Sequence, residues 1–210
     1  MDIVGKVQQI SILVPPILLA VTIHELAHGF VADRLGDPTP RLYGRLTLNP
    51  FKHLDLWGTL VFLITGMIGW AKPVPINGNH FKNPRKDMFW VALAGPASNI
   101  FLAFILAILY RFMGNLQLPH GLWLSILKPI YFMLQAGVVV NLGLACFNLL
   151  PIPPLDGSHL VEAFLPWQYL AWFKRLEVYG MLILILLLFS GAIDYFILPP
   201  LHFLVRAFLG

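Results

Sequence analysis

The sequence contains little charge and a single cysteine. Charged residues make up 11% of its 210 residues and hydrophobic residues 58%, with a mean hydropathy of +0.77. This composition excludes an ordinary soluble domain, because several stretches reach the roughly 20 residues that span a bilayer. Cys146, alone in an apolar segment, excludes a disulfide framework within the chain and is expected to be a small buried side chain. The net charge of +4 is scattered, without a basic run between aromatic residues, so nucleic acid is not expected as a partner.

Three ionisable side chains stand close together in the apolar residues 21–30. His24 and His28 are four residues apart, so on a helix their imidazoles project from one face, with Glu25 beside them. Charge inside a membrane is costly and marks function. The pattern is H-E-x-x-H, in which two imidazoles bind zinc and the glutamate is the general base of a metalloprotease. The alternative is an incidental histidine pair on a buried helix face, but random placement gives only about 0.003 such motifs in this chain.

The first part of the chain predicts a helix followed by mixed local structure. We expect the helix over residues 10–33, and we expect it to be retained because Lys6 is too little charge for a cleavable signal. Residues 41–49 alternate polar and apolar positions, which predicts a small membrane-associated β segment. The short apolar run 56–70 is typical of a re-entrant or short interfacial helix, and the prolines within 71–77 predict extended backbone.

The predicted fold class is an α-helical polytopic membrane protein, with residues 1–210 forming a single membrane-embedded domain. It has about four full spans, a re-entrant or short helix, and the small membrane-associated β segment. The four spans are expected at residues 10–33, 87–112, 125–150 and 176–198. Residues 158–175 are expected to lie at the membrane interface, and 201–210 to form a short surface-lying segment.

The distribution of lysine and arginine predicts the topology. If 56–70 is re-entrant, the connections 34–86 and 151–175 share one side of the membrane and hold ten of the 14 basic residues. The other side holds the remaining four, which are Lys6, Arg111, Lys128 and Arg206. This bias follows the positive-inside rule with the N-terminus outside, and it places the H-E-x-x-H motif toward the cytoplasmic side. If 56–70 crosses the membrane fully, the bias weakens.

A catalytic zinc takes three protein ligands, so the two histidines require a third residue. Asp156 is the best candidate, because it is an acid in apolar surroundings on a segment that three prolines keep out of a helix. Gly157 allows a sharp turn directly after it. His159 is a rival that we expect to face the interface instead. Four other histidines lie in polar or terminal stretches and are expected to be solvated: His53, His80, His120 and His202. The remaining acids are Asp33, Asp37 and Asp55, in or beside the first connection, and Asp194, near the far end of the last span.

Three motifs, in their order and spacing, resemble the site-2 protease family of intramembrane zinc metalloproteases. They are His24-Glu25-x-x-His28, Gly95-Pro96-x-x-Asn99, and Asn148-x-x-Pro151 leading into Asp156-Gly157. Residues 69–75 also resemble the compact prokaryotic branch of this family, which carries no PDZ or CBS domain. The resemblance covers about residues 10–165. Without such added domains, the way in which substrates are selected stays open.

The resemblance implies one zinc ion per chain, with His24, His28 and Asp156 as ligands and Glu25 as the catalytic acid/base. General chemistry agrees, since zinc lowers the pKa of its water to about 7 and a neighbouring carboxylate then takes the proton. The resemblance further implies an amide donor to the oxyanion, for which we assign Asn148. Asn99 is then expected to support the site or the substrate.

The expected substrates are proteins with transmembrane helices. Their peptide bonds are protected by helical hydrogen bonds, so cleavage requires local unwinding near the cytoplasmic side. Leu46, in the predicted β segment, or Val74, in the extended segment, would then hold the unwound chain by backbone pairing. Such cleavage serves regulated intramembrane proteolysis or the clearance of membrane-protein remnants. We expect the protein in a prokaryotic inner or plasma membrane, in contact with lipid, and leave its assembly into a homo-oligomer open.

Two interpretations from other classes are weighed against the protease. An intramembrane metal-binding transporter would also line a path with histidine and aspartate, but the predicted spans hold few further ionisable residues and no internal repeat. A catalytically silent protein that binds zinc or helices would have no use for Glu25 beside the ligands. Loss of proteolysis in a Glu25→Gln variant that keeps its zinc would favour the enzyme over both.

Overall fold

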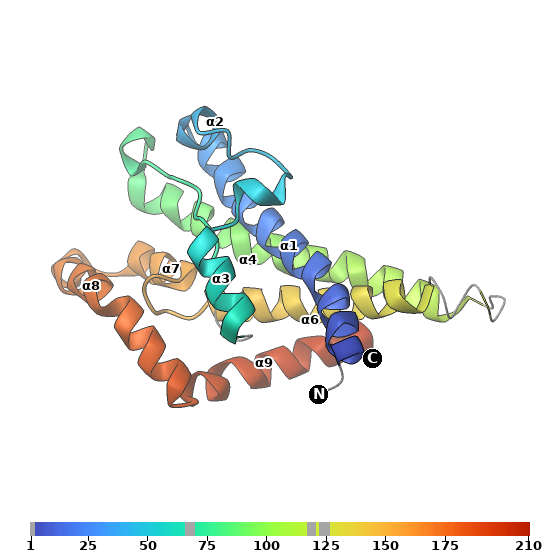
Figure 1. Cartoon of the computed structure of the whole chain (residues 1–210). Coiled ribbons are helices and arrows are strands. Elements are labelled where there is room, and N and C mark those ends of the chain that lie inside the picture. The colour runs from blue at the N-terminus through green and yellow to red at the C-terminus, as the bar shows by residue number, and fades with distance from the viewer. Residues whose placement is uncertain (1–2, 66–69, 117–120, 122–126) are drawn as a thin grey trace.

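The structure is a computed structural model that describes residues 3–65, 70–116, 121 and 127–210 (Figure 1). The longer helices are α1 (Ile3–Arg34), α4 (Pro84–Gly114), α6 (Lys128–Asn148), α8 (Trp167–Phe189) and α9 (Ala192–Leu209). The shorter ones are α2 (Thr39–Leu42), α3 (Leu56–Thr65) and α7 (Asp156–Phe164), with 3-10 turns η1 (Pro50–Lys52) and η2 (Gly78–His80).

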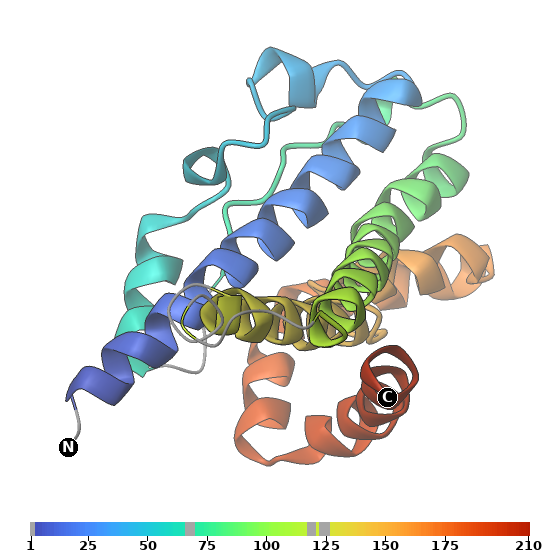
Figure 2. The same cartoon turned by 90° about the vertical axis from the view of Figure 1, so that its right-hand side faces the viewer.

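Helices α1, α4 and α6 pack on one another and form the centre of the molecule (Figures 1 and 2). Small residues allow the close approach of α4 and α6, since Ala103 and Ala107 of α4 are buried against Val138 and Leu142 of α6. The apolar face of α9 covers this cluster. Helix α7 lies against α4, which brings the chain after the prolines back to the central helices.

Among the described residues, four helices are long and apolar enough to cross a membrane. These candidate spans are Val7–Arg34, Pro84–Gly114, Lys128–Asn148 and Ala192–Leu209. The first three agree with the predicted spans, although residues 125–126 of the third prediction lie outside the described part. A mostly helical membrane protein is therefore confirmed as the fold class.

The predicted fourth span, residues 176–198, is wrong in position. The chain turns between α8 and α9 at Gly191, whose φ of 69° is left-handed and ends a helix at little cost only for glycine (Figure 1). The sequence 176–198 is therefore divided between two helices, and residues 201–210 continue α9 instead of forming a separate surface segment. Apolar content alone predicted one uninterrupted span here, because it does not register the break.

The predicted β segment at 41–49 is also wrong within the described residues. Thr39–Leu42 is the short helix α2, begun by prolines, and Gly44 follows in a turn with a φ of 63°. The polar positions that suggested alternation serve tertiary contacts instead, since Arg45 is buried and hydrogen-bonded to other segments. The β-type pairing that the described chain does contain is an isolated antiparallel bridge between Leu54 and Ala71.

The segments on either side of residues 66–69 agree with the expected short helix and extended backbone. Helix α3 has 10 residues and is about 15 Å long, half the thickness of a bilayer core. The remainder of the predicted re-entrant run, residues 66–69, lies outside the described residues. Residues 72–77 contain no helix and run alongside α1 (Figure 2), where Val74 packs on Gly29.

Candidate metal centre

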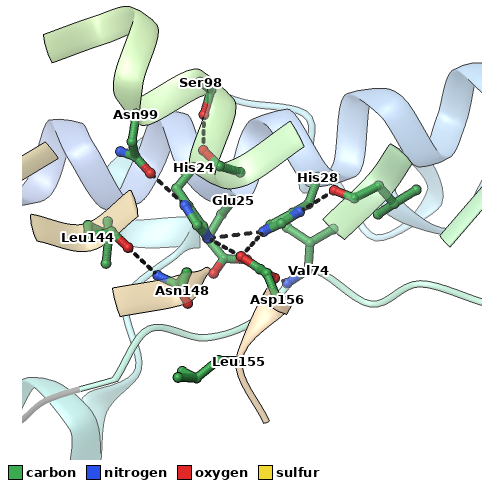
Figure 3. Close-up of polar contacts among 12 residues, drawn as sticks. His24, Glu25, His28, Val74, Ser98, Asn99, Leu144, Asn148, Leu155 and Asp156 are labelled. Carbon is green, nitrogen blue, oxygen red and sulfur yellow. Dashed lines mark hydrogen bonds and ion pairs between the residues drawn. The ribbon is translucent and has the colours of Figure 1, made fainter. Parts of the chain in front are cut away.

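Two histidines of α1 and the first residue of α7 bring three possible metal ligands together (Figure 3). The Nε2 atoms of His24 and His28 lie 3.0 Å apart. The Oδ2 atom of Asp156 lies 3.1 Å from Nε2 of His24 and 3.3 Å from Nε2 of His28. Both histidines are buried, and Asp156 is only partly accessible. Residues far apart in the chain thus meet in the interior, as the sequence predicted for these three.

Hydrogen bonds from α4 fix the tautomer of both imidazoles. Nδ1 of His28 lies 2.7 Å from the carbonyl oxygen of Val91, and Nδ1 of His24 lies 2.6 Å from Oδ1 of Asn99. The amide nitrogen of Asn99 donates to the Ala20 carbonyl and to Oδ1 of Asn141, so its oxygen is the atom that faces His24. Each Nδ1 therefore carries a proton, and in the neutral imidazole each Nε2 presents a lone pair to the centre.

This arrangement places three acceptors face to face. With both Nε2 atoms unprotonated, no hydrogen bond can form between the imidazoles and the carboxylate, and Oδ2 of Asp156 is buried with no hydrogen-bond partner. Converging lone pairs repel one another unless a cation lies between them. Two imidazole nitrogens and a carboxylate oxygen are a donor set that zinc prefers, with three protein ligands typical of a catalytic ion. The residues present therefore fit a zinc ion.

Gly95 of α4 leaves the space that the two imidazoles occupy. A Cβ atom at this position would lie 2.4 Å from Nε2 of His28 and 2.6 Å from Cε1 of His24. In the sequence, Gly95 stood out only as part of the motif Gly95-Pro96-x-x-Asn99. The structure shows that the metal-binding pair itself occupies the space beside it, so Gly95 is required by the site.

The position of Asp156 depends on contacts at both ends of α7. At its start, a Cβ atom on Gly157 would lie 2.3 Å from the Leu150 carbonyl oxygen, so only glycine lets the chain fold back this tightly. At its end, Nη2 of Arg85 donates to the carbonyl oxygens of Glu162 at 2.6 Å and Leu165 at 2.5 Å. Arg85 thereby satisfies the free carbonyls of a helix C-terminus and attaches α7 to α4.

The carboxylate of Glu25 contacts the extended segment. Its Oε2 atom accepts a hydrogen bond of 2.9 Å from the backbone N–H of Val74. Arg45 fixes the residues just before, donating to the carbonyl oxygens of Lys72 at 2.5 Å and Pro73 at 2.6 Å, and also to that of Lys52. Burial lowers the pKa of Arg45, an effect that the negative charge of Glu25 opposes.

Asp37 fixes the same segment at its far end. This fully buried carboxylate accepts hydrogen bonds from the N–H of Asn77 at 2.7 Å and from Nδ1 of His80 at 2.9 Å. It also accepts from the backbone N–H and the hydroxyl of Thr39. Burial alone would raise the pKa of Asp37, but these hydrogen bonds outweigh it and the pKa is lowered.

The other predicted residues take positions close to the centre without joining the ligand cluster. The side-chain amide of Asn148 lies beside the cluster (Figure 3) but donates to the Leu144 carbonyl of its own helix at 2.9 Å. Leu46 and Val74 flank Gly29 of α1, where a Cβ atom would lie 3.0 Å and 3.2 Å from their side chains. Val74 is only 6% exposed, and its backbone N–H is the group bonded to Glu25.

None of the rival ligands within the described residues joins the cluster. His159 lies 3.4 Å from Glu162 instead, and His80 binds Asp37. His120 lies outside the described residues. The prediction for His53 was wrong in another respect. A solvated His53 was expected from its polar surroundings, but it is fully buried and its Nε2 lies 2.9 Å from the Thr47 carbonyl oxygen.

Sequence reasoning did not assign roles to Arg45, Asp37, Arg85 and Asn141. All four act through contacts with residues distant in the chain, so no local pattern identifies them. A buried charge in the polar connection is visible only once its partners are placed.

Comparison with known proteins agrees with this geometry. The model of Peptidase family M50 matches residues 12–128 and 125–191. The relative "Putative zinc metalloprotease YwhC" of Bacillus subtilis is 40% identical over 194 residues, covering 90% of this chain and 85% of the relative. "Putative zinc metalloprotease Rip2" of Mycolicibacterium smegmatis is 31% identical over 185 residues, covering 84% of this chain and 66% of the relative. No solved structure matches the chain significantly.

The chain belongs to peptidase family M50, the site-2 protease family. Together with the four candidate spans, this membership identifies an integral membrane protein of a metalloprotease family.

Proposed function

We propose that this protein is an intramembrane zinc endopeptidase that cleaves peptide bonds within transmembrane segments of membrane proteins. The observation that carries the proposal is the meeting of three potential ligand atoms from His24, His28 and Asp156 between helices long enough to span a bilayer. Glu25 follows His24 directly, as the chemistry requires. A structural zinc site has no use for an acid in this position.

The residues divide the chemistry of amide hydrolysis among them. His24, His28 and Asp156 would hold one zinc ion per chain. When bound, zinc lowers the pKa of water to about 7 and polarises a carbonyl group. Glu25 takes the proton from the attacking water and passes it to the leaving amine. Asn148 releases its bond to its own helix and donates to the oxyanion, while Asn99 keeps His24 in the required tautomer.

The distribution of charge supports an active site on the cytoplasmic side of a prokaryotic cell membrane. His24 and His28 lie in the second half of the span Val7–Arg34, toward the end from which the basic connection 35–83 continues. Lys174 and Arg175, in the connection between the third and fourth candidate spans, fall on this same side. By the positive-inside rule this side is cytoplasmic. Both relatives named above are bacterial.

The substrates we propose are membrane proteins whose transmembrane helices unwind near that side. The extended residues 72–77 lie directly beside Glu25, so an unwound segment paired there would reach the centre, with Leu46 and Val74 bordering it. Regulated intramembrane proteolysis and removal of membrane-protein remnants are the roles that such cleavage serves.

The proposal is tested with a panel of single-span peptides in liposomes and a count of bound zinc. Wild type should cleave at least one peptide and hold one zinc per chain. Glu25→Gln should keep zinc and lose cleavage, whereas Asp156→Ala should bind zinc more weakly and lose cleavage. Asp194→Ala, which removes an exposed carboxylate on α9, is the matched control and should behave as wild type. A wild type without zinc, or a Glu25→Gln variant that cleaves normally, would refute the proposal.

A further inference from the structure

The carboxylate of Glu25 has a single hydrogen-bond partner among the described residues, and that partner is a backbone group. The N–H of Val74 donates to Oε2 at 2.9 Å. Glu25 is one residue after His24 on α1, so its side chain leaves the helix about 100° around from the ligand face. A glutamate in this position has three rotatable bonds and needs a partner to keep its carboxylate oriented.

The donor is held more firmly than an ordinary loop amide. Pro75 restricts the backbone of Val74 to extended conformations, and Pro73 fixes its own φ directly before it. Before it, the buried guanidinium of Arg45 binds the carbonyl oxygens of Lys72 and Pro73. The N–H of Lys72 is also bound, donating to the His53 carbonyl at 2.9 Å.

The chain after Val74 is fixed in the same way. Three residues on, the N–H of Asn77 is bound by the fully buried carboxylate of Asp37. The direction of the Val74 N–H is therefore set by contacts on both sides of it. Buried charged groups are costly unless each is paired, so two of them bound to this short extended segment indicate that its conformation matters.

We propose that the backbone N–H of Val74 is the positioning group of Glu25, and that Arg45 is a positioning residue that acts through it. This inference rests on the function proposed above. The hydrogen bond occupies Oε2 and leaves Oε1 as the oxygen that receives the proton and returns it. Positioning of this kind changes the rate of the chemical step and leaves substrate binding unchanged.

This role differs measurably from backbone pairing with substrate. If the Val74 N–H were a donor to the unwound substrate, its loss would weaken binding and raise KM. If it positions Glu25, its loss lowers kcat while KM stays constant. The two roles make opposite predictions for one substitution.

The test compares Val74→Pro with Val74→Ala in the full-length protein, measuring kcat, KM and bound zinc with a peptide that wild type cleaves. Proline removes the N–H and keeps much of the side chain in an already extended backbone, whereas alanine removes most of the side chain and keeps the N–H. We expect Val74→Pro to lower kcat about 10- to 100-fold, with KM within about twofold of wild type and zinc retained. Val74→Ala should stay within about threefold of the wild-type kcat.

Two further variants keep the test decisive. Ile76→Pro removes the N–H two residues away, which has no partner among the described residues and is free to pair with substrate, so it should raise KM and leave kcat close to that of wild type. Arg45→Lys keeps the charge but replaces two terminal nitrogens, of which Nη1 binds the Lys52 carbonyl and Nη2 those of Lys72 and Pro73, with a single nitrogen, and should lower kcat about fivefold at constant KM. If Val74→Pro fails to fold, as judged by zinc content and thermal unfolding, the kcat and KM of Arg45→Lys decide whether the positioning role holds.

The outcomes separate this inference from the proposed function. Equal losses in Val74→Pro and Val74→Ala, a change in KM alone, or a normal kcat in Val74→Pro would overturn the positioning role while wild type remains a protease. An inactive wild type, or an active Glu25→Gln variant measured alongside, would instead overturn the proposed function.

Discussion

The two sides of the metal centre are built in different ways. The histidines lie on one continuous helix in the centre of the molecule, and α4 binds both of their Nδ1 atoms. Asp156 begins a nine-residue helix outside the central three, after a proline-rich turn, and depends on contacts at the two ends of that helix. The histidine side is thus preformed by the core, whereas the aspartate side forms only when α7 docks.

This difference predicts how substitutions outside the three ligands change zinc binding. A change in the core displaces two ligands at once, because both imidazoles share one space beside α4. A change at α7 affects only one ligand and leaves a two-histidine site that binds zinc more weakly. The loss of zinc affinity should therefore depend on which side is disturbed.

The largest effect is expected from Gly95→Ala on the histidine side. The added methyl group would lie 2.4 Å from Nε2 of His28, so the imidazoles must move and activity should fall by roughly 100-fold or more, with zinc lost. Bound zinc and peptide cleavage are the measurements. Gly143→Ala on α6 is the matched control, since a Cβ atom there meets open space. Normal zinc content in Gly95→Ala would show that the histidine side is not rigid.

A smaller effect is expected from Arg85→Met on the aspartate side. Losing the bonds to the α7 carbonyls lets Asp156 move, while His24 and His28 keep their contacts with α4. Zinc affinity, measured by competition with a chelator, should fall about tenfold, as it does when a group that orients a ligand is removed. Lys86→Met, at the neighbouring position, should leave affinity unchanged. An effect as large as that of Gly95→Ala would remove the distinction between the two sides.

The smallest effect concerns Asp37, which holds the extended segment beside the histidine side. Its pKa is lower in the folded protein than in the unfolded chain, so its contribution to stability is present above the unfolded pKa of about 4 and is lost as pH falls through the folded pKa. Asp37→Asn should therefore unfold at a lower temperature than wild type at pH 7. The difference in melting temperature should shrink below pH 4.

Ligand protonation affects both proteins equally, so only the difference between wild type and Asp37→Asn reports on Asp37. A difference that stays constant from pH 7 to pH 3 would contradict this role.

The parts of the site that the sequence predicted are those that local geometry determines. His24, Glu25 and His28 fall within five residues of one helix, so their spacing alone defines how they project. Asp156 could be selected because an acid that follows three prolines in an apolar region is costly to bury without a cation or a donor beside it. The helices 7–34, 84–114 and 128–148 followed from length and composition in the same way.

The failed predictions share a physical cause in distant contacts. The alternation at 41–49 resembled a strand because Arg45 is polar, yet Arg45 is buried and binds a segment 27 residues further on. His53 was expected in solvent because the residues around it are polar, but it is fully buried. The break at Gly191 depends on a backbone angle that hydropathy does not record. Burial of polar groups by tertiary partners cannot be recognised before those partners are placed.

The alternating prolines of the extended segment also determine which way it can associate. In extended backbone the N–H groups of residues 73, 75 and 77 point to one side, but the first two are prolines and the third is bound to Asp37. That side offers no free donor to another strand. On the other side the N–H groups of Lys72 and Val74 are already bound to His53 and Glu25, so within residues 72–77 Ile76 alone keeps a donor that is free of partners in the described part of the chain, and the segment resists edge-to-edge aggregation on both sides.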